Sequence, residues 1–277
     1  MFNEKLWPPP WLVFPQLDRS SMGWRMGAGE DYLFKRIRWW RTLTPEQQAA
    51  YEQLFPKPAG WDGDNTFRYG DLSLPLWQPE GRPRYTRRWA EEAKHSGTLP
   101  PMLPFWGPQP AKDGRITQSC FSQWWASDFR FREVEYNCME QCMMAGKAKL
   151  FMDRDTEAQI MAADDPMVIK KLGRKVSPFD EALWEEAKYS LILNGNYAKF
   201  TQNEELRRFL LSTGDQLLVE ASPYDTVWGV GLGAEDSRLQ DPAQWRGQNL
   251  LGFALMEVRD EIRRVYANEH LCMEPCW

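Results

Sequence analysis

Prolines are concentrated at one end of this chain of 277 residues, and their distribution limits what the chain can fold into. Residues 1–112 hold 15 of the 20 prolines and 9 of the 15 tryptophans. Because proline has no backbone N–H and interrupts helices, this part should consist of short elements and extended segments. The last dense run of prolines, LPPMLPFWGPQPAKDG at 99–114, predicts a boundary near residue 112. Residues 1–112 are therefore predicted to be a Pro/Trp-rich extension.

Charge and composition narrow the class of protein. The extension carries 15 Lys+Arg against 12 Asp+Glu, a net charge of +3, which leaves −8 on the remainder and −5 in total. Hydrophobic residues make up 43%, no apolar run approaches a membrane span, and the first residues lack a signal-peptide pattern. Five cysteines, an odd number, make a disulfide framework improbable. We therefore expect a cytoplasmic protein without a membrane partner.

The extension contains two basic patches that also carry aromatic residues, KRIRWWR at 35–41 and RPRYTRR at 82–88. Helices are expected over 30–41, over 45–55 and shortly after Tyr85. Arginine beside aromatic rings is typical of single-stranded nucleic-acid binding. The same residues also suit packing of the extension onto the main domain. Both interpretations remain open, and packing is favoured.

Residues 113–266 predict a mainly helical α+β domain with a few short strands, followed by a tail at 267–277. The evidence is alternation over 129–136 and a buried run at 216–222 for strands, with caps and periodicity for helices. The expected helices are 137–152, one from Pro166 to Gly173, one from Pro178 to about Phe200, one capped by Thr201 and Glu204, and 249–266.

Glu140 and Lys147 stand two turns apart on the helix expected over 137–152, so they share a face. A carboxylate and an amine on one face suit acid/base or nucleophilic chemistry. Asn137 and Glu140 also have the spacing of a helix cap, and a helical lysine is usually solvated. On spacing alone, these structural roles are favoured.

A second constellation lies on the loop EASPYDTVWGVG, which follows the buried run and carries Glu220, Asp225 and Trp228. Its glycines permit close backbone approach to a ligand, but it is not a P-loop because no Lys-Ser/Thr follows. The only two histidines and the cysteine spacing argue against a metal site.

Five motifs follow one another along the chain: FSQWW (121–125), YNCMEQCMMAGKAKLF (136–151), IKKLGRKV (169–176), the 198–233 run and WRGQNLLGFALMEVRDEI (245–262). This succession resembles the NADAR superfamily (NAD- and ADP-ribose-associated), which includes the YbiA-type N-glycosidases. The resemblance covers roughly 113–265 and leaves the extension outside.

The resemblance implies catalytic and substrate-binding positions on this chain. Catalytic roles would belong to Glu140, Lys147 and Asp225; substrate contacts would belong to Gln123, Trp124, Arg174, Trp228, Gly229, Gly231 and Asn249. Arg174 and Asn249 suit phosphate or ribose contact. Many YbiA-type members have Asn and His where this chain has Gln123 and Gln141, which puts in doubt any mechanism that uses that histidine.

The resemblance also implies a reaction: hydrolysis of the bond between C1 of a ribose and an exocyclic amine, with no metal or cofactor. The leading expectation is removal of ADP-ribose from guanine bases of DNA or RNA, which would make an ADP-ribose or ribose-phosphate N-glycoside the substrate. The alternative is hydrolysis of phosphoribosylamino-pyrimidine intermediates of riboflavin synthesis. A non-catalytic ADP-ribose-binding module is the alternative of another class.

Overall fold

The computed structural model describes residues 2, 4–17, 19–59, 61 and 83–274. The helices are α1 Pro10–Val13, α2 Ala28–Trp40, α3 Pro45–Leu54, α4 Arg87–His95, α5 Met139–Leu150, α6 Arg154–Met161, α7 Pro166–Gly173, α8 Glu181–Gln202, α9 Glu204–Ser212 and α10 Leu250–Val265. The strands are β1 Met102–Phe105, β2 Phe129–Phe131, β3 Val134–Tyr136 and β4 Leu217–Glu220. The predicted α+β fold, mainly helical with a few short strands, is confirmed.

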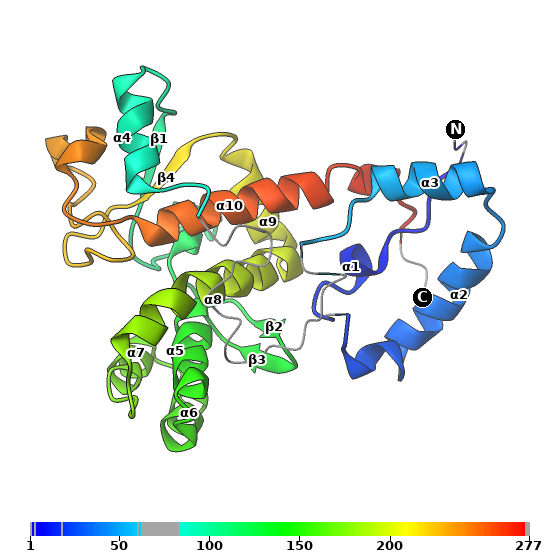
Figure 1. Cartoon of the computed structure of the whole chain (residues 1–277), viewed down its shortest axis with the longest axis horizontal. Helices are drawn as coiled ribbons and strands as arrows, with labels where there is room; N and C mark the ends of the chain where they lie inside the picture. Colours follow the sequence, from blue (N-terminus) through cyan, green and yellow to red (C-terminus); the bar gives the residue numbers. More distant parts are fainter. Residues whose placement is uncertain (1, 3, 18, 60, 62–82, 275–277) are drawn as a thin grey trace.

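Two helices, α8 and α10, form the centre of the molecule (Figure 1). They pack against each other, and α10 also covers β4, while α5 packs against α6, α7 and α8. Most side chains of α10 are buried, including Phe253, Leu255 and Ile262. The apolar face of α10 explains its central place, and the helix also buries charged side chains, among them Glu257 and Arg259.

The strands form two small sheets. β1 and β4 pair in parallel, with Met102 opposite Leu217, and β2 and β3 form an antiparallel hairpin. The prediction of one strand over 129–136 was wrong, because Arg132 and Glu133 adopt positive φ angles and turn the chain back. Two such residues make the tight turn that joins twisted strands.

The helix boundaries show which local signals were sufficient. Thr44 forms the expected capping box with Gln47, and Asp165 caps α7 as predicted. Pro178 does not start a helix: α8 begins at Glu181 with Asp180 as its cap. Thr201 does not cap α9. It lies inside α8, where its hydroxyl group donates a hydrogen bond to the carbonyl of Tyr197.

The helix α6 was not expected from the sequence. Asp153 caps it by accepting a hydrogen bond from the backbone N–H of Thr156. No helix of the described residues is long and apolar enough to cross a membrane.

The extension shares one hydrophobic core with the rest of the chain. Buried residues such as Leu6, Tyr51 and Phe55 belong to the same cluster as the side chains of α8 and α10. β1, which also lies before residue 112, completes the sheet of β4. Both the sheet and the core therefore extend across the boundary predicted at residue 112.

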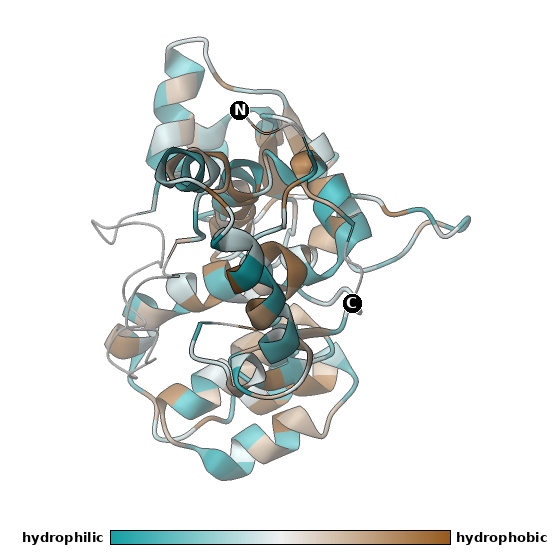
Figure 2. Cartoon of the chain, turned by 90° about the vertical axis from the view of Figure 1, so that its right-hand side faces the viewer, coloured by the Kyte–Doolittle hydropathy of each residue, from teal (hydrophilic) through white to brown (hydrophobic). Residues whose placement is uncertain are grey.

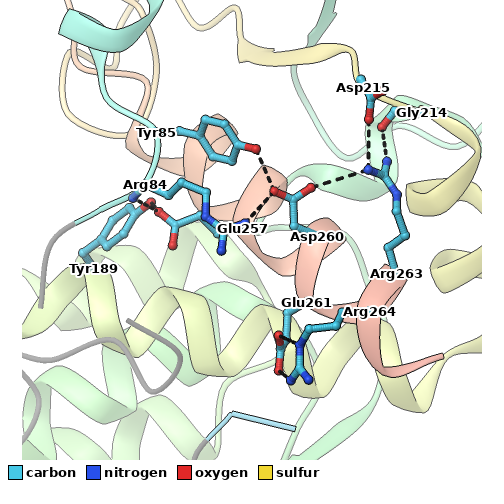
Figure 3. Close-up of polar contacts among 10 residues, drawn as sticks. All are labelled: Arg84, Tyr85, Tyr189, Gly214, Asp215, Glu257, Asp260, Glu261, Arg263 and Arg264. Carbon is cyan, nitrogen blue, oxygen red and sulfur yellow. Dashed lines mark hydrogen bonds and ion pairs between the residues drawn. The ribbon is translucent and has the colours of Figure 1, made fainter. Parts of the chain in front are cut away.

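Polar contacts also fasten the extension to α10 (Figure 3). Arg84 and Tyr85 both bond Asp260, at 3.0 and 2.6 Å, and the backbone N–H of Arg84 donates to Glu257. Farther along α10, the backbone N–H of Ala59 donates to Glu261 at 2.7 Å. These contacts hold two segments of the extension, around Ala59 and around Arg84, against α10.

Candidate active site

Glu140 lies in the first turn of α5 with its carboxyl group buried, only 2% exposed. Its backbone N–H donates to the carbonyl of Gln123 at 2.8 Å, and Cys138 is the N-cap residue. The side chain that reaches back over the helix start is Gln141, which accepts from the backbone N–H of Asn137. The capping role considered for Glu140 is therefore taken by its neighbour, and the Glu140 carboxyl group points elsewhere.

That carboxyl group has one partner and one free oxygen. The indole N–H of Trp124 donates to Oε2 at 3.2 Å, whereas Oε1 is buried with no hydrogen-bond partner among the described residues. A buried polar atom without a partner is costly, and a substrate proton or hydroxyl group would satisfy it. This is the arrangement expected of a group that acts on a ligand.

The surroundings raise the pKa of Glu140 to about 7. Burial is the main cause, because it disfavours the charged form. Lys170, the Trp124 hydrogen bond and Arg174 act against burial, while the carboxylate of Asp225 adds to it. A carboxyl group with a pKa near neutrality can both donate and accept a proton at physiological pH.

Asp225 belongs to the glycine-rich loop after β4. Its Oδ1 accepts from the backbone N–H groups of Val227 and Trp228, at 2.9 and 2.8 Å, which fixes the carboxylate on the loop. A side chain at Gly229 would place its Cβ 2.8 Å from the carbonyl oxygen of Glu220, and Gly231 has a φ of 69°. Both glycines are therefore required for the tight fold of this loop.

Glu220 is a third carboxyl group of this cluster, and the sequence analysis assigned it no role. Its Oε2 is buried without a partner among the described residues. Burial is again the main cause that raises its pKa, to about 8, followed by Asp225; Lys170 lowers it, and Glu140 adds to the rise. The signal that could have identified Glu220 in the sequence is its position at the end of a buried strand, directly before the loop.

Asn249 holds Glu220 in place. The asparagine is fully buried, and its φ of 57° is a left-handed conformation that asparagine tolerates. Its Oδ1 accepts from the backbone N–H of Glu220, and its Nδ2 donates to the carbonyl of Leu218, both at 2.9 Å. Both halves of its amide thus bond β4, and the predicted contact of Asn249 with ribose or phosphate stays a prediction.

Two cations flank the carboxyl groups, and only one of them was predicted. Arg174 is exposed just after the last turn of α7. Lys170 lies one turn earlier on α7, partly buried, with Nζ 5.8 Å from the ring centroid of Trp124. The spacing of four residues, which puts both cations on one helix face, would have identified Lys170.

Lys147 lies in an aromatic setting farther along α5. Its Nζ is 4.3 Å from the ring centroid of Phe179 and 5.5 Å from that of Trp184, and it donates to the carbonyl of Gly173 at 3.0 Å. Burial lowers its pKa, which increases the fraction of neutral amine. The bond to Gly173 places Lys147 beside the end of α7, next in sequence to Arg174.

The two remaining predicted residues, Gln123 and Trp228, lie around the same elements. Gln123 is buried, with Nε2 3.6 Å from the sulfur of Met143 and with Oε1 unpartnered among the described residues. Trp228 is partly exposed, and Nζ of Lys188 lies 6.0 Å from its ring centroid. The structure thus brings together Glu140, Trp124, Asp225 and Arg174, with Glu220 and Lys170 as additions.

Comparisons with known proteins identify the family of the chain. The NADAR domain model matches residues 104–263, which is more than half of the chain. N-glycosidase R617 of Acanthamoeba polyphaga mimivirus is 41% identical over 146 residues, covering 51% of this chain and 86% of that protein. N-glycosidase YbiA of Escherichia coli (strain K12) is 33% identical over 116 residues, covering 42% of this chain and 66% of its own length.

A solved structure is also similar. The NMR structure of the E. coli protein YbiA aligns with a TM-score of 0.49 at 27% identity, covering 64% of this chain and 92% of that chain. The match of the domain model includes every carboxyl group and cation described above. The chain belongs to the NADAR domain family.

Proposed function

We propose that this protein hydrolyses the N-glycosidic bond between C1 of a ribose and an exocyclic amine. The observation that carries the proposal is the carboxyl group of Glu140, buried, half-unpartnered and with a pKa raised to about 7. Relatives named N-glycosidases in the same family support the reaction class.

Glu140 is suited to the acid role. An amine leaves C1 only when it takes up a proton, and a protonated carboxyl group with a pKa near 7 can supply one. The Trp124 indole N–H holds Oε2, which leaves the buried Oε1 as the carboxyl oxygen without a partner among the described residues. Oε1 therefore carries the proton that the departing amine takes.

The neighbouring carboxylate of Asp225 is suited to the base role. Glycosidases use one carboxyl group as acid and a second to accept the proton of the attacking water. Asp225 would take that proton while the water oxygen bonds to C1 and the C1–N bond breaks. Glu220, whose pKa is raised to about 8, keeps its own proton near neutral pH. The products are the free amine and a ribose with a hydroxyl group at C1.

A second route to the same products uses the amine of Lys147. After the ribose ring opens to an imine at C1, the amine of Lys147 adds to C1 and the exocyclic amine leaves with a proton. Water then hydrolyses the Schiff base and frees the lysine. The lowered pKa of Lys147 favours this route, since only the neutral amine adds to C1.

We propose ADP-ribose attached to guanine in DNA or RNA as the substrate. Lys170 and Arg174 supply positive charge beside the carboxyl groups, which suits the phosphates next to the ribose. The test is a parallel assay of the purified protein on a guanine-ADP-ribosylated oligonucleotide and on the two riboflavin intermediates. We expect faster release of the sugar from the oligonucleotide.

Faster turnover of the riboflavin intermediates would overturn the substrate and keep the reaction. Binding without release of any sugar would identify a non-catalytic reader. Reduction with borohydride during turnover should attach the sugar covalently to the protein, and Lys147→Arg should abolish that adduct. A working enzyme that forms no adduct excludes the lysine route.

A further inference from the structure

A cavity lies in the extension, whose helices α1, α2 and α3 lie together at one end of the molecule (Figure 1). Its volume is about 700 Å³, and the described residues that line it lie between Pro10 and Trp61. It shares no lining residue with the carboxyl cluster around Glu140. Viewed from this side, the helices mix hydrophilic and hydrophobic segments (Figure 2).

Aromatic rings form much of the cavity wall. Trp61 meets Trp11 edge-on with ring centroids 5.3 Å apart, and it meets Trp24 in the same way at 6.3 Å. Trp24 and Trp61 are only partly buried, so part of their surface stays open. Flat rings with accessible surface suit a flat aromatic ligand, such as a nucleobase, which stacks on them without regard to sequence.

Cations complete the wall. Arg36 lies with its guanidinium carbon 5.2 Å from the ring centroid of Trp40 and 5.5 Å from that of Tyr51. Arg19 and Lys57 also line the cavity, and Glu52 is the one acidic residue among the described residues of the wall. A net positive wall disfavours a cationic ligand, which an aromatic cage alone would attract, and it favours an anion.

Two polar groups of the wall lack partners. The indole N–H of Trp11 is buried and donates to no acceptor among the described residues, although this side chain is only 7% exposed. The Nε of Arg36 is also buried and has no acceptor among the described residues. Buried donors without a partner are costly, and a ligand whose acceptor atoms reach them after a small side-chain movement would remove that cost.

We propose that this cavity binds a nucleotide unit, with the base against the indole rings and the phosphate near Arg36. The unit is either a free nucleotide or one residue of a single-stranded nucleic acid. The proposal does not depend on the reaction at Glu140, because it concerns separate residues and binding alone.

The test is binding of a short, unmodified, fluorescein-labelled single-stranded oligonucleotide, followed by fluorescence anisotropy at several salt concentrations. Arg36→Gln and Trp24→Leu should each weaken binding by roughly tenfold, the effect of losing one stacking or phosphate contact. Arg36→Gln should also reduce the salt dependence by about one phosphate contact. Circular dichroism melting confirms that each variant is folded.

Matched controls separate a site from general attraction of a polyanion. Arg38 is exposed on the same helix as Arg36, and Trp106 is 58% exposed elsewhere, so Arg38→Gln and Trp106→Leu should change binding little. Equal losses for Arg36→Gln and Arg38→Gln would overturn the proposal, as would no binding of any nucleotide at low salt.

A competition arm identifies the source of the nucleotide. If AMP displaces the oligonucleotide and Arg36→Gln weakens AMP binding, the cavity takes free nucleotides. If the oligonucleotide binds in an Arg36-dependent manner and AMP does not compete, the cavity holds one unit of a longer strand.

Discussion

At the scale of single residues, the burial of Glu140 has a cost in stability that its replacement should reveal. Glu140→Gln keeps the size of the side chain and an oxygen for the Trp124 indole, but it cannot donate a carboxyl proton. We expect turnover to fall by roughly 10²- to 10⁴-fold, the range for loss of a general acid. The fold should remain intact.

The same variant should be more stable than the natural protein at high pH. The pKa of Glu140 is higher in the folded state than in the unfolded state, so folding loses stability as pH rises between about 4.5 and 7. Glu140→Gln removes that loss, which amounts to about 3 kcal/mol at most. Its melting temperature should exceed that of the natural protein at pH 8 and match it at pH 4. Lower stability at both pH values would show that Glu140 serves the fold.

Lys170 tests the electrostatic coupling within the site. Its positive charge lowers the pKa of Glu140, so Lys170→Gln should raise that pKa further. The basic limb of the pH profile of kcat/KM, where the acid loses its proton, should move to higher pH. Lys171→Gln, which removes an exposed charge next to it, should leave the limb in place. An unchanged limb in both variants would contradict the acid role of Glu140.

The residue types of the site could be predicted from the sequence, but several of their tasks could not. Glu140 and Asp225 do converge, although more than 80 residues separate them. The bonds of Asn249 to β4 could not be predicted, because they depend on a positive φ that appears only in the folded loop. Glu220 gained its role only from the burial that the fold creates.

At the scale of elements, the loop after β4 depends on Asn249. Asn249→Ala removes two buried hydrogen bonds and leaves the groups of Glu220 and Leu218 unpaired. We expect a loss of about 2–4 kcal/mol in the free energy of unfolding, measured by urea denaturation.

Asn249→Gly separates the two causes of that loss. Glycine lacks the same hydrogen bonds but adopts the left-handed conformation without strain, so this variant should be about 1 kcal/mol more stable than Asn249→Ala. If both variants are as stable as the natural protein, Asn249 does not hold the loop, and its predicted contact with the substrate regains its basis.

Local signals predicted those elements that local chemistry decides. The starts of α3 and α7 could be predicted because Thr44 and Asp165 are common N-cap residues that each precede a proline. The hairpin of β2 and β3 was missed because its turn uses Arg132 and Glu133 in place of the usual Asn-Gly or Asp-Gly. The pairing of β1 with β4 joins segments more than 100 residues apart, which no local pattern encodes.

At the scale of the whole molecule, the uneven composition separated two regions of sequence that the fold joins. The arginines of 82–88 that the structure describes are engaged: Arg84 with Asp260, Arg87 with Glu91 and the carbonyl of Ala243, and Arg88 with Glu92. Arg84 and Arg87 thus contact the rest of the chain, as the packing interpretation expects, whereas Arg88 pairs within its own helix and stays exposed. The patch at 35–41 includes Arg36, which lines the cavity of the extension.

A shared core predicts that the extension and the NADAR domain unfold together. Phe55 is 1% exposed in that core, just after α3, where Lys57 and Leu54 accept hydrogen bonds from Arg264 and Asn268. Phe55→Ala should cost about 3–5 kcal/mol and lower the melting temperature by about 2–4 °C per kcal/mol. Calorimetry should show a single transition, and enzymatic activity should disappear at the same lowered temperature. Phe34→Ala, at a site 60% exposed on α2, should change the melting temperature little. Two separate transitions, with activity lost only in the unshifted one, would show that the extension folds as an independent unit.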